Sequence, residues 1–189
     1  MANPVDLNRG GMTERRPAQA GRTAFPGFAT PAAGFDEPFE MLSGCHERVE
    51  RTLGLLARLV PYVHERGVDD VAANAASDIL RYFDLAAPRH HEDEERHVFP
   101  EVLRGADEVL KAQVNRLQAD HRAMTEAWAL LRPQLAALTT KPEALDVAAL
   151  SVASAKLSGL YDEHIRIENS IVFPAARASM SPAQLTAMS

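Results

Sequence analysis

The stretch HHEDEERHVFP, residues 90–100, decides the fold, because the chain repeats its pattern as HIRIENSIVFP, residues 164–174. Each copy opens with a His, has a Glu four positions later and closes with Val-Phe-Pro. These residues are His90 and Glu94 in the first copy and His164 and Glu168 in the second. A His and a Glu four positions apart lie on one face of a helix, one turn from each other. The repeat therefore predicts two helices that carry matching pairs of a nitrogen donor and a carboxylate donor.

Apolar residues recur around both copies at alternating spacings of three and four, the pattern of helices that bury one face. This spacing predicts four helices, near residues 38–65, 70–104, 107–138 and 142–176. Asp69 and Asp70 follow Gly67 as an expected helix start, and Pro88 predicts a kink or a loosened turn before the first copy. The expected fold class is all-α, an antiparallel up-down-up-down four-helix bundle with an extended N-terminal tail.

The bundle is expected over residues 35–177. Residues 1–34 are rich in Gly, Pro, Ala and Arg and show no periodicity, so we expect a tail that is flexible or lies along the domain surface. An arm that binds a partner through Phe25 and Phe28 is the alternative. Residues 178–189 are expected to form a C-terminal tail.

Composition narrows the classes of function. The net charge of −6 argues against nucleic-acid binding, and no apolar run approaches the roughly 20 residues that a membrane span needs. The only cysteine, Cys45, permits no internal disulfide, and the N-terminus, MANPVDLNRG, has no apolar core behind a basic start. We therefore expect a cytoplasmic protein that binds neither nucleic acid nor membranes.

Two further histidines, His46 and His121, lie on the apolar faces of the first and third expected helices, so that each helix carries one. Two carboxylates buried among leucines are costly unless cations compensate their charge. Imidazoles and bridging carboxylates together offer about eight donor atoms, twice the roughly four that a single zinc takes. The set predicts two ions, with iron or manganese suited to the mixed donors and zinc a possible substitute. A buried His–Glu hydrogen-bond network without metal is the alternative.

The ordered set of motifs resembles the hemerythrin-like family of cation-binding bundles over residues 35–177. The resemblance implies an antiparallel four-helix bundle around a non-haem di-iron centre, in which two iron ions share an oxo or hydroxo bridge and two bridging carboxylates. The ligands that it implies are His46, His90, Glu94, His121, His164 and Glu168.

The chain departs from the oxygen-carrying branch of that family, which has a His-x-x-x-His pair on its third helix. Here Leu117 and Thr125 stand four positions before and after His121. His91 could supply the missing nitrogen. Its counterpart in the second copy is Ile165, an apolar residue, so a side chain at this position can face inward. The alternative is that His91 lies at the surface or beside the ligands. The departure argues against reversible oxygen carriage and makes the chain more similar to the branch tied to iron-centre repair and nitrosative stress.

Several functions stay open on these residues. The first is a di-iron protein that senses, binds or handles dioxygen, nitric oxide or iron. A di-iron oxidase or peroxidase acting on peroxide or nitric oxide is the second, and a structural bundle with zinc or an empty site is the third. The sequence leaves open whether the protein is an enzyme and what its oligomeric state is.

Neighbours of the expected ligands have two interpretations each. Tyr161 either hydrogen-bonds near the site or packs in the core. Glu95 and Glu163 either orient an imidazole or, as we expect, belong to a solvated face. His97 is expected to be half-buried near the site without ligating, and Cys45 to be a small buried residue rather than a redox-active thiol.

Overall fold

The computed structural model describes residues 37–105 and 107–188, and within these residues it contains helices and no strands. The prediction of an all-α bundle is confirmed. The expected N-terminal tail, residues 1–34, lies outside the described residues. Within the described ranges, no helix combines the length and the apolar character needed to cross a bilayer.

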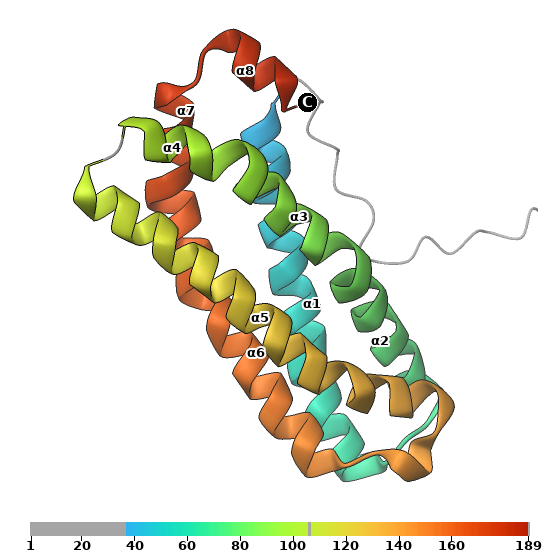
Figure 1. Ribbon diagram of the computed structural model, residues 1–189. Coiled ribbons are helices and arrows are strands. Elements are labelled where there is room, and N and C mark those ends of the chain that lie inside the picture. The colour runs from blue at the N-terminus through green and yellow to red at the C-terminus, as the bar shows by residue number, and fades with distance from the viewer. Residues whose placement is uncertain (1–36, 106, 189) are drawn as a thin grey trace, which may run out of the picture. The chain divides into compact units, whose positions relative to one another are not determined.

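Four long helical stretches build the described bundle. The first is α1 (Pro38–Arg66), and the third is α5 (Glu108–Thr140). The second stretch joins α2 (Asp70–Arg81), η1 (Tyr82–Ala86), α3 (Ala87–Asp93), η2 (Glu94–Val98) and α4 (Phe99–Gly105). The fourth joins α6 (Val147–Ile167), η4 (Glu168–Val172) and α7 (Phe173–Ser179). In Figure 1 the chain descends through α1 and α5 and ascends through the other two stretches, with α1 beside α2 and α6, and α5 beside α2 and α6.

Aspartates begin three of these helices. The side chains of Asp69, Asp107 and Asp146 each accept a hydrogen bond of 2.9 Å from the backbone N–H three residues later. Such N-caps stabilise a helix by about 1 kcal/mol each. The start predicted at Asp69 is confirmed. The fourth helix was expected from residue 142, but Pro142–Ala144 forms a separate 3-10 turn, and the cap at Asp146 delays α6 to Val147.

Within the described residues, three π-helical turns widen the long stretches, and each ends two residues before a proline. The backbone N–H groups of Ala87, Phe99 and Phe173 donate to carbonyls five residues earlier, those of Tyr82, Glu94 and Glu168. A proline has no N–H to donate and clashes with the carbonyl four residues before it, so a wider turn relieves both problems. The loosened turn predicted at Pro88 takes this form. Two of the three turns begin at the glutamates of the repeated motif.

Two apolar clusters fill the bundle, one on each side of a polar layer. The lower cluster, towards the α1–α2 connection at the bottom of Figure 1, includes Leu56, Ile79, Leu131, Leu150 and Leu157. The upper cluster includes Phe39, Phe99, Leu117, Ile167 and Phe173. The polar layer lies between them along every helical stretch, since each stretch contributes residues to both clusters.

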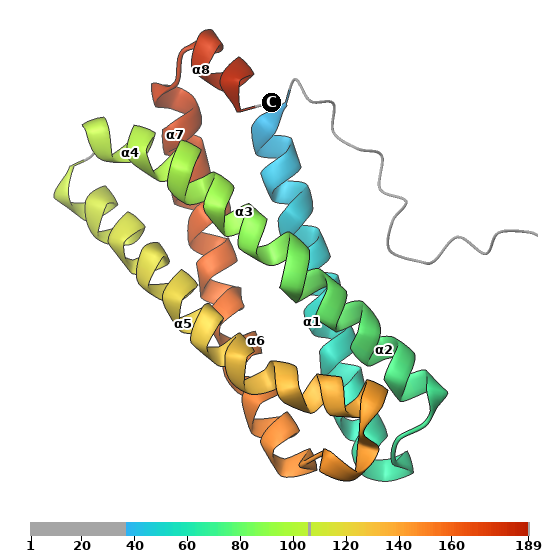
Figure 2. The same cartoon turned by 45° about the vertical axis from the view of Figure 1, so that its right-hand side comes forward.

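The C-terminal residues, expected to be a tail, contain the short helix α8 (Pro182–Ala187). Ser181 and Gln184 form a capping box at its start, and Gln184 donates a hydrogen bond of 2.7 Å to Glu101 of α4. Leu185 and Met188 pack against the upper cluster. Helix α8 therefore covers the end of the bundle where α1 begins, as both ribbon views show (Figures 1 and 2).

Candidate metal centre

The polar layer consists of the six residues that the resemblance implies as ligands, and the structure buries all of them. His46 comes from α1, His90 from α3, Glu94 from η2, His121 from α5, His164 from α6 and Glu168 from η4. None is more than 4% exposed, and both glutamates are completely buried. Four histidines and two carboxylates in one desolvated layer are unusual unless something compensates the charge.

The six residues form two groups of possible metal donors that share both glutamates. His46 and His90 make up the α1/α3 half-site, and His121 and His164 make up the α5/α6 half-site. Each pair, taken with Glu94 and Glu168, offers ligand atoms that all lie within 4.8 Å of one another. This sharing is what two ions held by two bridging carboxylates require.

Contacts in the α1/α3 half-site involve one oxygen of each carboxylate. The His46 Nε2 atom lies 3.1 Å from Glu168 Oε2 and 3.7 Å from Glu94 Oε1. His90 Nε2 lies 3.2 Å from the same Glu94 Oε1. Both imidazoles therefore turn Nε2 towards the shared carboxylates.

The α5/α6 half-site uses the other oxygen of each carboxylate. His121 Nε2 lies 3.5 Å from Glu94 Oε2, and His164 Nε2 lies 3.2 Å from Glu168 Oε1. The two Nε2 atoms are 3.2 Å apart, so both lie on the same side of the shared carboxylates. Each carboxylate thus spans the two half-sites with one oxygen in each.

The donor set fits metal ions because it is not satisfied by the protein. Within the described residues, all four carboxylate oxygens of Glu94 and Glu168 are buried and have no hydrogen-bond partner, and neither has His46 Nε2. A buried polar atom without a partner costs roughly 1–3 kcal/mol, and more when it is charged. Cations between the half-sites would satisfy these atoms at once.

Burial and mutual contacts displace the pKa values of the layer. Burial and the charge of Glu168 raise the pKa of Glu94 well above its usual value. Burial lowers the pKa of His46, but its close contacts with Glu168 and Glu94 outweigh burial and raise that pKa to about 10. In the α5/α6 half-site, burial and the neighbouring His164 lower the pKa of His121 to about 4. His121 is therefore a neutral imidazole at pH 7, the form that binds metal.

Two outer residues hydrogen-bond the second nitrogen of an imidazole, and a third, Asp120, lies near the second nitrogen of His164 without a hydrogen bond. Asn169 Oδ1 lies 2.9 Å from His46 Nδ1, and Glu95 Oε1 lies 2.9 Å from His121 Nδ1. Asp120 Oδ2 lies 3.5 Å from His164 Nδ1. Partners of this kind fix the ring orientation and the tautomer, which leaves Nε2 free to bind a metal ion.

The structure corrects the expectation that Glu95 belongs only to a solvated face, because its carboxylate contacts His121 while 44% of its side chain is exposed. Sequence reasoning missed Asn169 and Asp120. A signal was available for Asn169, since Glu95 and Asn169 occupy the same position in the two copies of the motif. Glu163, in contrast, pairs with Arg166 at 2.6 Å on the exposed face, as expected.

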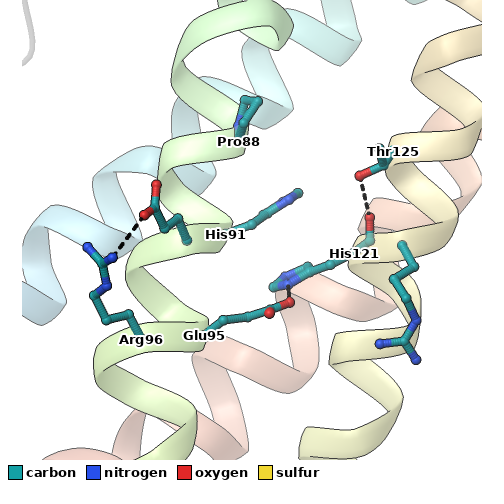
Figure 3. Close-up of a pocket in the computed structure, with 8 residues that line it drawn as sticks. Pro88, His91, Glu95, Arg96, His121 and Thr125 are labelled. Atoms are coloured by element: carbon teal, nitrogen blue, oxygen red, sulfur yellow. Dashed lines mark hydrogen bonds and ion pairs between the residues drawn. The ribbon is translucent and has the colours of Figure 1, made fainter.

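His91 lies beside the α5/α6 half-site. Its ring stacks on that of His121 with centroids 4.0 Å apart, and its Nε2 is buried without a hydrogen-bond partner in the described chain. One possible metal-binding group combines His91 with His121 and His164. Figure 3 shows His91 extending from α3 into the space between α3 and α5, next to His121 and the Glu95 that bonds it. Both groups that contain Glu94 and Glu168 leave His91 out, so its contact with the donor layer is through His121 and His164.

An open pocket of about 560 Å³ lies over His91 and His121 (Figure 3). Its remaining lining residues are Pro88, Glu92, Glu95, Arg96, Arg122 and Thr125. None of the lining residues belongs to the α1/α3 half-site. The pocket therefore approaches the centre from the α5/α6 side.

Aromatic rings enclose the layer, and the two Val-Phe-Pro sequences contribute equivalent ones. Phe173 stacks on His46 at 5.3 Å and Phe99 on His121 at 5.7 Å, between ring centroids. Tyr161 is buried and packs its ring against His91 and His164, in agreement with the core-packing alternative. His97 is half-buried and outside the donor groups found among the described residues. Cys45 is half-buried.

Comparison with known proteins gives the same assignment for the whole bundle. Residues 37–176 match the family described as the hemerythrin HHE cation binding domain. An uncharacterized protein of Haemophilus influenzae is 33% identical over 156 residues, which cover 82% of this chain and 88% of that protein. The buried His/Glu layer, the repeated motif and the family match agree, and the chain belongs to the hemerythrin HHE cation-binding family.

Proposed function

We propose that the protein binds two iron ions at the centre and uses them to sense, bind or handle dioxygen, nitric oxide or iron itself. The observation that carries the proposal is the arrangement of Glu94 and Glu168, each of which presents one unpartnered oxygen to each half-site. Two cations a few ångströms apart repel each other, and two shared carboxylates offset that repulsion.

The residue types support iron or manganese over zinc. Four imidazoles and two carboxylates form a mixed nitrogen and oxygen set, which suits iron or manganese, while zinc would bind as a substitute. When bound, the two ions, with an oxo or hydroxo bridge, would supply redox chemistry and open positions for a diatomic ligand or peroxide. His46, His90, His121 and His164, with Glu94 and Glu168, would hold them, and His91 would add a nitrogen to the α5/α6 half-site.

The surroundings determine what reaches the centre. The two apolar clusters and the stacked Phe99 and Phe173 exclude bulk water from both ends of the layer. The pocket at His91 gives small molecules an approach from α3 and α5. Leu117 is buried in the upper cluster where the oxygen-carrying branch has a histidine, which supports a role other than reversible oxygen carriage.

The test is purification without oxygen, followed by metal analysis and optical spectra before and after adding dioxygen and nitric oxide. About two irons per chain and a spectral change with one of the gases support the proposal. A protein that takes up no iron after reconstitution contradicts it, and one that binds only zinc and no gas favours a structural role.

Catalytic turnover of peroxide or nitric oxide is a second candidate, favoured by the open pocket that borders His91 and His121. An enzyme would consume many equivalents per chain, and Glu94→Ala would abolish the consumption. Binding of one equivalent without turnover rejects this candidate.

We also propose a cytoplasmic location and no nucleic-acid partner. The single cysteine fits a reducing compartment, and the net charge of −6 disfavours a phosphate backbone as partner.

A further inference from the structure

The two halves of the centre are related residue by residue. His46 and His121 correspond, as do His90 and His164, and each half-site repeats the contact from a Phe ring to the first of its histidines. This correspondence makes it possible to compare the outer partners of equivalent imidazoles. The comparison rests on the proposed function, because it concerns the ions that the imidazoles would hold.

The first difference lies behind the stacked histidines. His121 Nδ1 contacts the carboxylate of Glu95, whereas His46 Nδ1 contacts the amide of Asn169, both at 2.9 Å. Glu95 and Asn169 are equivalent positions of the repeat, one residue after the shared glutamates. The α5/α6 half-site therefore has an anionic partner where the α1/α3 half-site has a neutral one.

The second difference lies behind the other pair of histidines. Asp120 Oδ2 lies 3.5 Å from His164 Nδ1. Cys45 stands at the position equivalent to Asp120, immediately before the stacked histidine of its helix. Neither His90 Nδ1 nor His164 Nδ1 has a hydrogen-bond partner in the described chain, so the difference between them is the charge of the nearby Asp120. Both outer differences thus place a carboxylate on the α5/α6 side. Arg122, which also acts on His121, and Asp93, which acts on Cys45 and Glu94 on the other side, offset part of this difference in charge.

The charge difference has a definite physical consequence. A carboxylate that accepts the imidazole N–H makes Nε2 a stronger donor, and its charge favours a more highly charged ion nearby. Solvent screens part of the effect, since Glu95 is 44% and Asp120 22% exposed, and Arg116 lies 3.9 Å from Asp120. Glu95, with the shorter contact and no cation paired to it in the described chain, has the larger influence.

We propose that Glu95 and Asn169 set a difference in reduction potential between the two ion positions. The α5/α6 half-site stabilises the ferric ion, and the α1/α3 half-site is the one reduced first. Glu95 and Asn169 act as positioning residues that set this order through His121 and His46. The half-site that stays ferric after the first electron is added is also the one beside the pocket.

The test uses two substitutions of matched shape in the iron-loaded, full-length protein. Glu95→Gln removes the charge behind His121, and Asn169→Asp introduces one behind His46. The measured quantities are the two one-electron midpoint potentials. A tenfold change in the preference for ferric over ferrous iron is within the range for outer partners and corresponds to about 59 mV. We expect Glu95→Gln to raise the lower potential and Asn169→Asp to lower the higher one, so both narrow the gap while their mean potentials move in opposite directions.

Glu92→Gln is the matched control, since Glu92 lines the same pocket one turn earlier and contacts no histidine of the centre. The inference is supported if the gap between the two midpoint potentials narrows with Glu95→Gln and with Asn169→Asp, and if Glu92→Gln narrows it by less than a third as much. An unchanged or wider gap in both variants, or equal shifts with Glu92→Gln, overturns it. If the wild-type protein binds no iron, the proposed function fails as well. If it binds two irons but neither substitution alters the gap between the two midpoint potentials, only the role proposed for Glu95 and Asn169 is refuted. Circular dichroism verifies that each variant is folded.

Discussion

The two His-x-x-x-Glu copies direct equivalent atoms at one centre, but the residues between the shared His, Glu and Val-Phe-Pro positions all differ. After His90 comes His91, which stacks on His121, and after His164 comes the buried apolar Ile165. Glu94 and Glu168 are then followed by Glu95 and Asn169, which bond opposite imidazoles. The donors are symmetric because the motif is repeated, whereas the charge and accessibility of the half-sites depend on the residues between the donors.

The largest effect should follow from removing a shared donor. Glu94→Gln or Glu168→Gln replaces a shared carboxylate with a neutral amide that has a single oxygen. The amide can neither bridge two ions nor offset their repulsion, so both ions should bind more weakly. We expect metal affinity to fall by more than about 100-fold, beyond the range typical of outer partners. Metal analysis after equilibrium dialysis measures this, with Glu92→Gln as the folded control. Unchanged binding of both ions would show that the carboxylates do not bridge.

Metal removal should destabilise the bundle strongly. A ligand at about 1,000 times its Kd stabilises the folded state by about 4.1 kcal/mol, which for a chain of this size raises Tm by roughly 10 °C. Thermal melts with and without chelator measure the difference. Leu56→Ala in the lower cluster is the control, because it should lower both melts by similar amounts. Identical melts for wild-type protein with and without chelator would argue for an empty site.

The metal-free protein should lose stability in opposite pH directions through the two half-sites. The pKa of His46 is raised to about 10, so its contribution is complete below pH 6.5 and is lost as the pH rises towards 10. The pKa of His121 is lowered to about 4, so its contribution is present above pH 6.5 and is lost as the pH falls towards 4. The stability profile therefore has an alkaline arm, from His46, and an acidic arm, from His121. Over each arm the free energy of unfolding changes by on the order of 3 kcal/mol.

Urea unfolding of the metal-free protein from pH 4 to pH 9 measures both arms. His46→Gln should flatten the alkaline arm, and His121→Gln should flatten the acidic one. A profile in which either substitution flattens both arms would contradict this division between the half-sites.

A smaller effect should follow from making the copies more alike. His91→Ile gives the first copy the residue that the second copy has at this position. If His91 donates its nitrogen to the ion on the pocket side, that ion should bind about tenfold more weakly. The affinity for the other ion should not change. Stepwise titration of the metal-free protein with Co²⁺ measures the two affinities. Ile165→Val, a change of one methyl group at the equivalent position, is the control. Unchanged affinities would assign His91 to the pocket wall alone.

The spacing of apolar residues predicted the helices well, because a buried face repeats over many turns and a single exception does not obscure it. It could not predict the π turns at Glu94 and Glu168, since apolar spacing does not report which carbonyl a backbone N–H bonds. Prolines alone are no guide, because Pro61 and Pro133 lie inside α1 and α5 without a widened turn. Helix α8 was missed because six residues are too few to show a period, although Ser181 and Gln184 have the spacing of a capping box.

The candidate site was predictable to the extent that its residues repeat. The six buried donors form one layer in the structure, which follows from their common helical face and register. The outer contacts of Glu95 and Asp120 depend on the rotation of one helix against the next, which the order of residues along a single helix does not contain. The interpretation of Glu95 as a surface residue failed for this reason, since its side chain is both exposed and bonded to His121.

The most direct measurement of the central claim is an anomalous-scattering map from crystals of the iron-loaded protein. The account predicts two peaks per chain between Glu94 and Glu168, one contacted by His46 and His90 and the other by His121 and His164. A single peak held by all the histidines, or no peak in this layer at full iron loading, would contradict it.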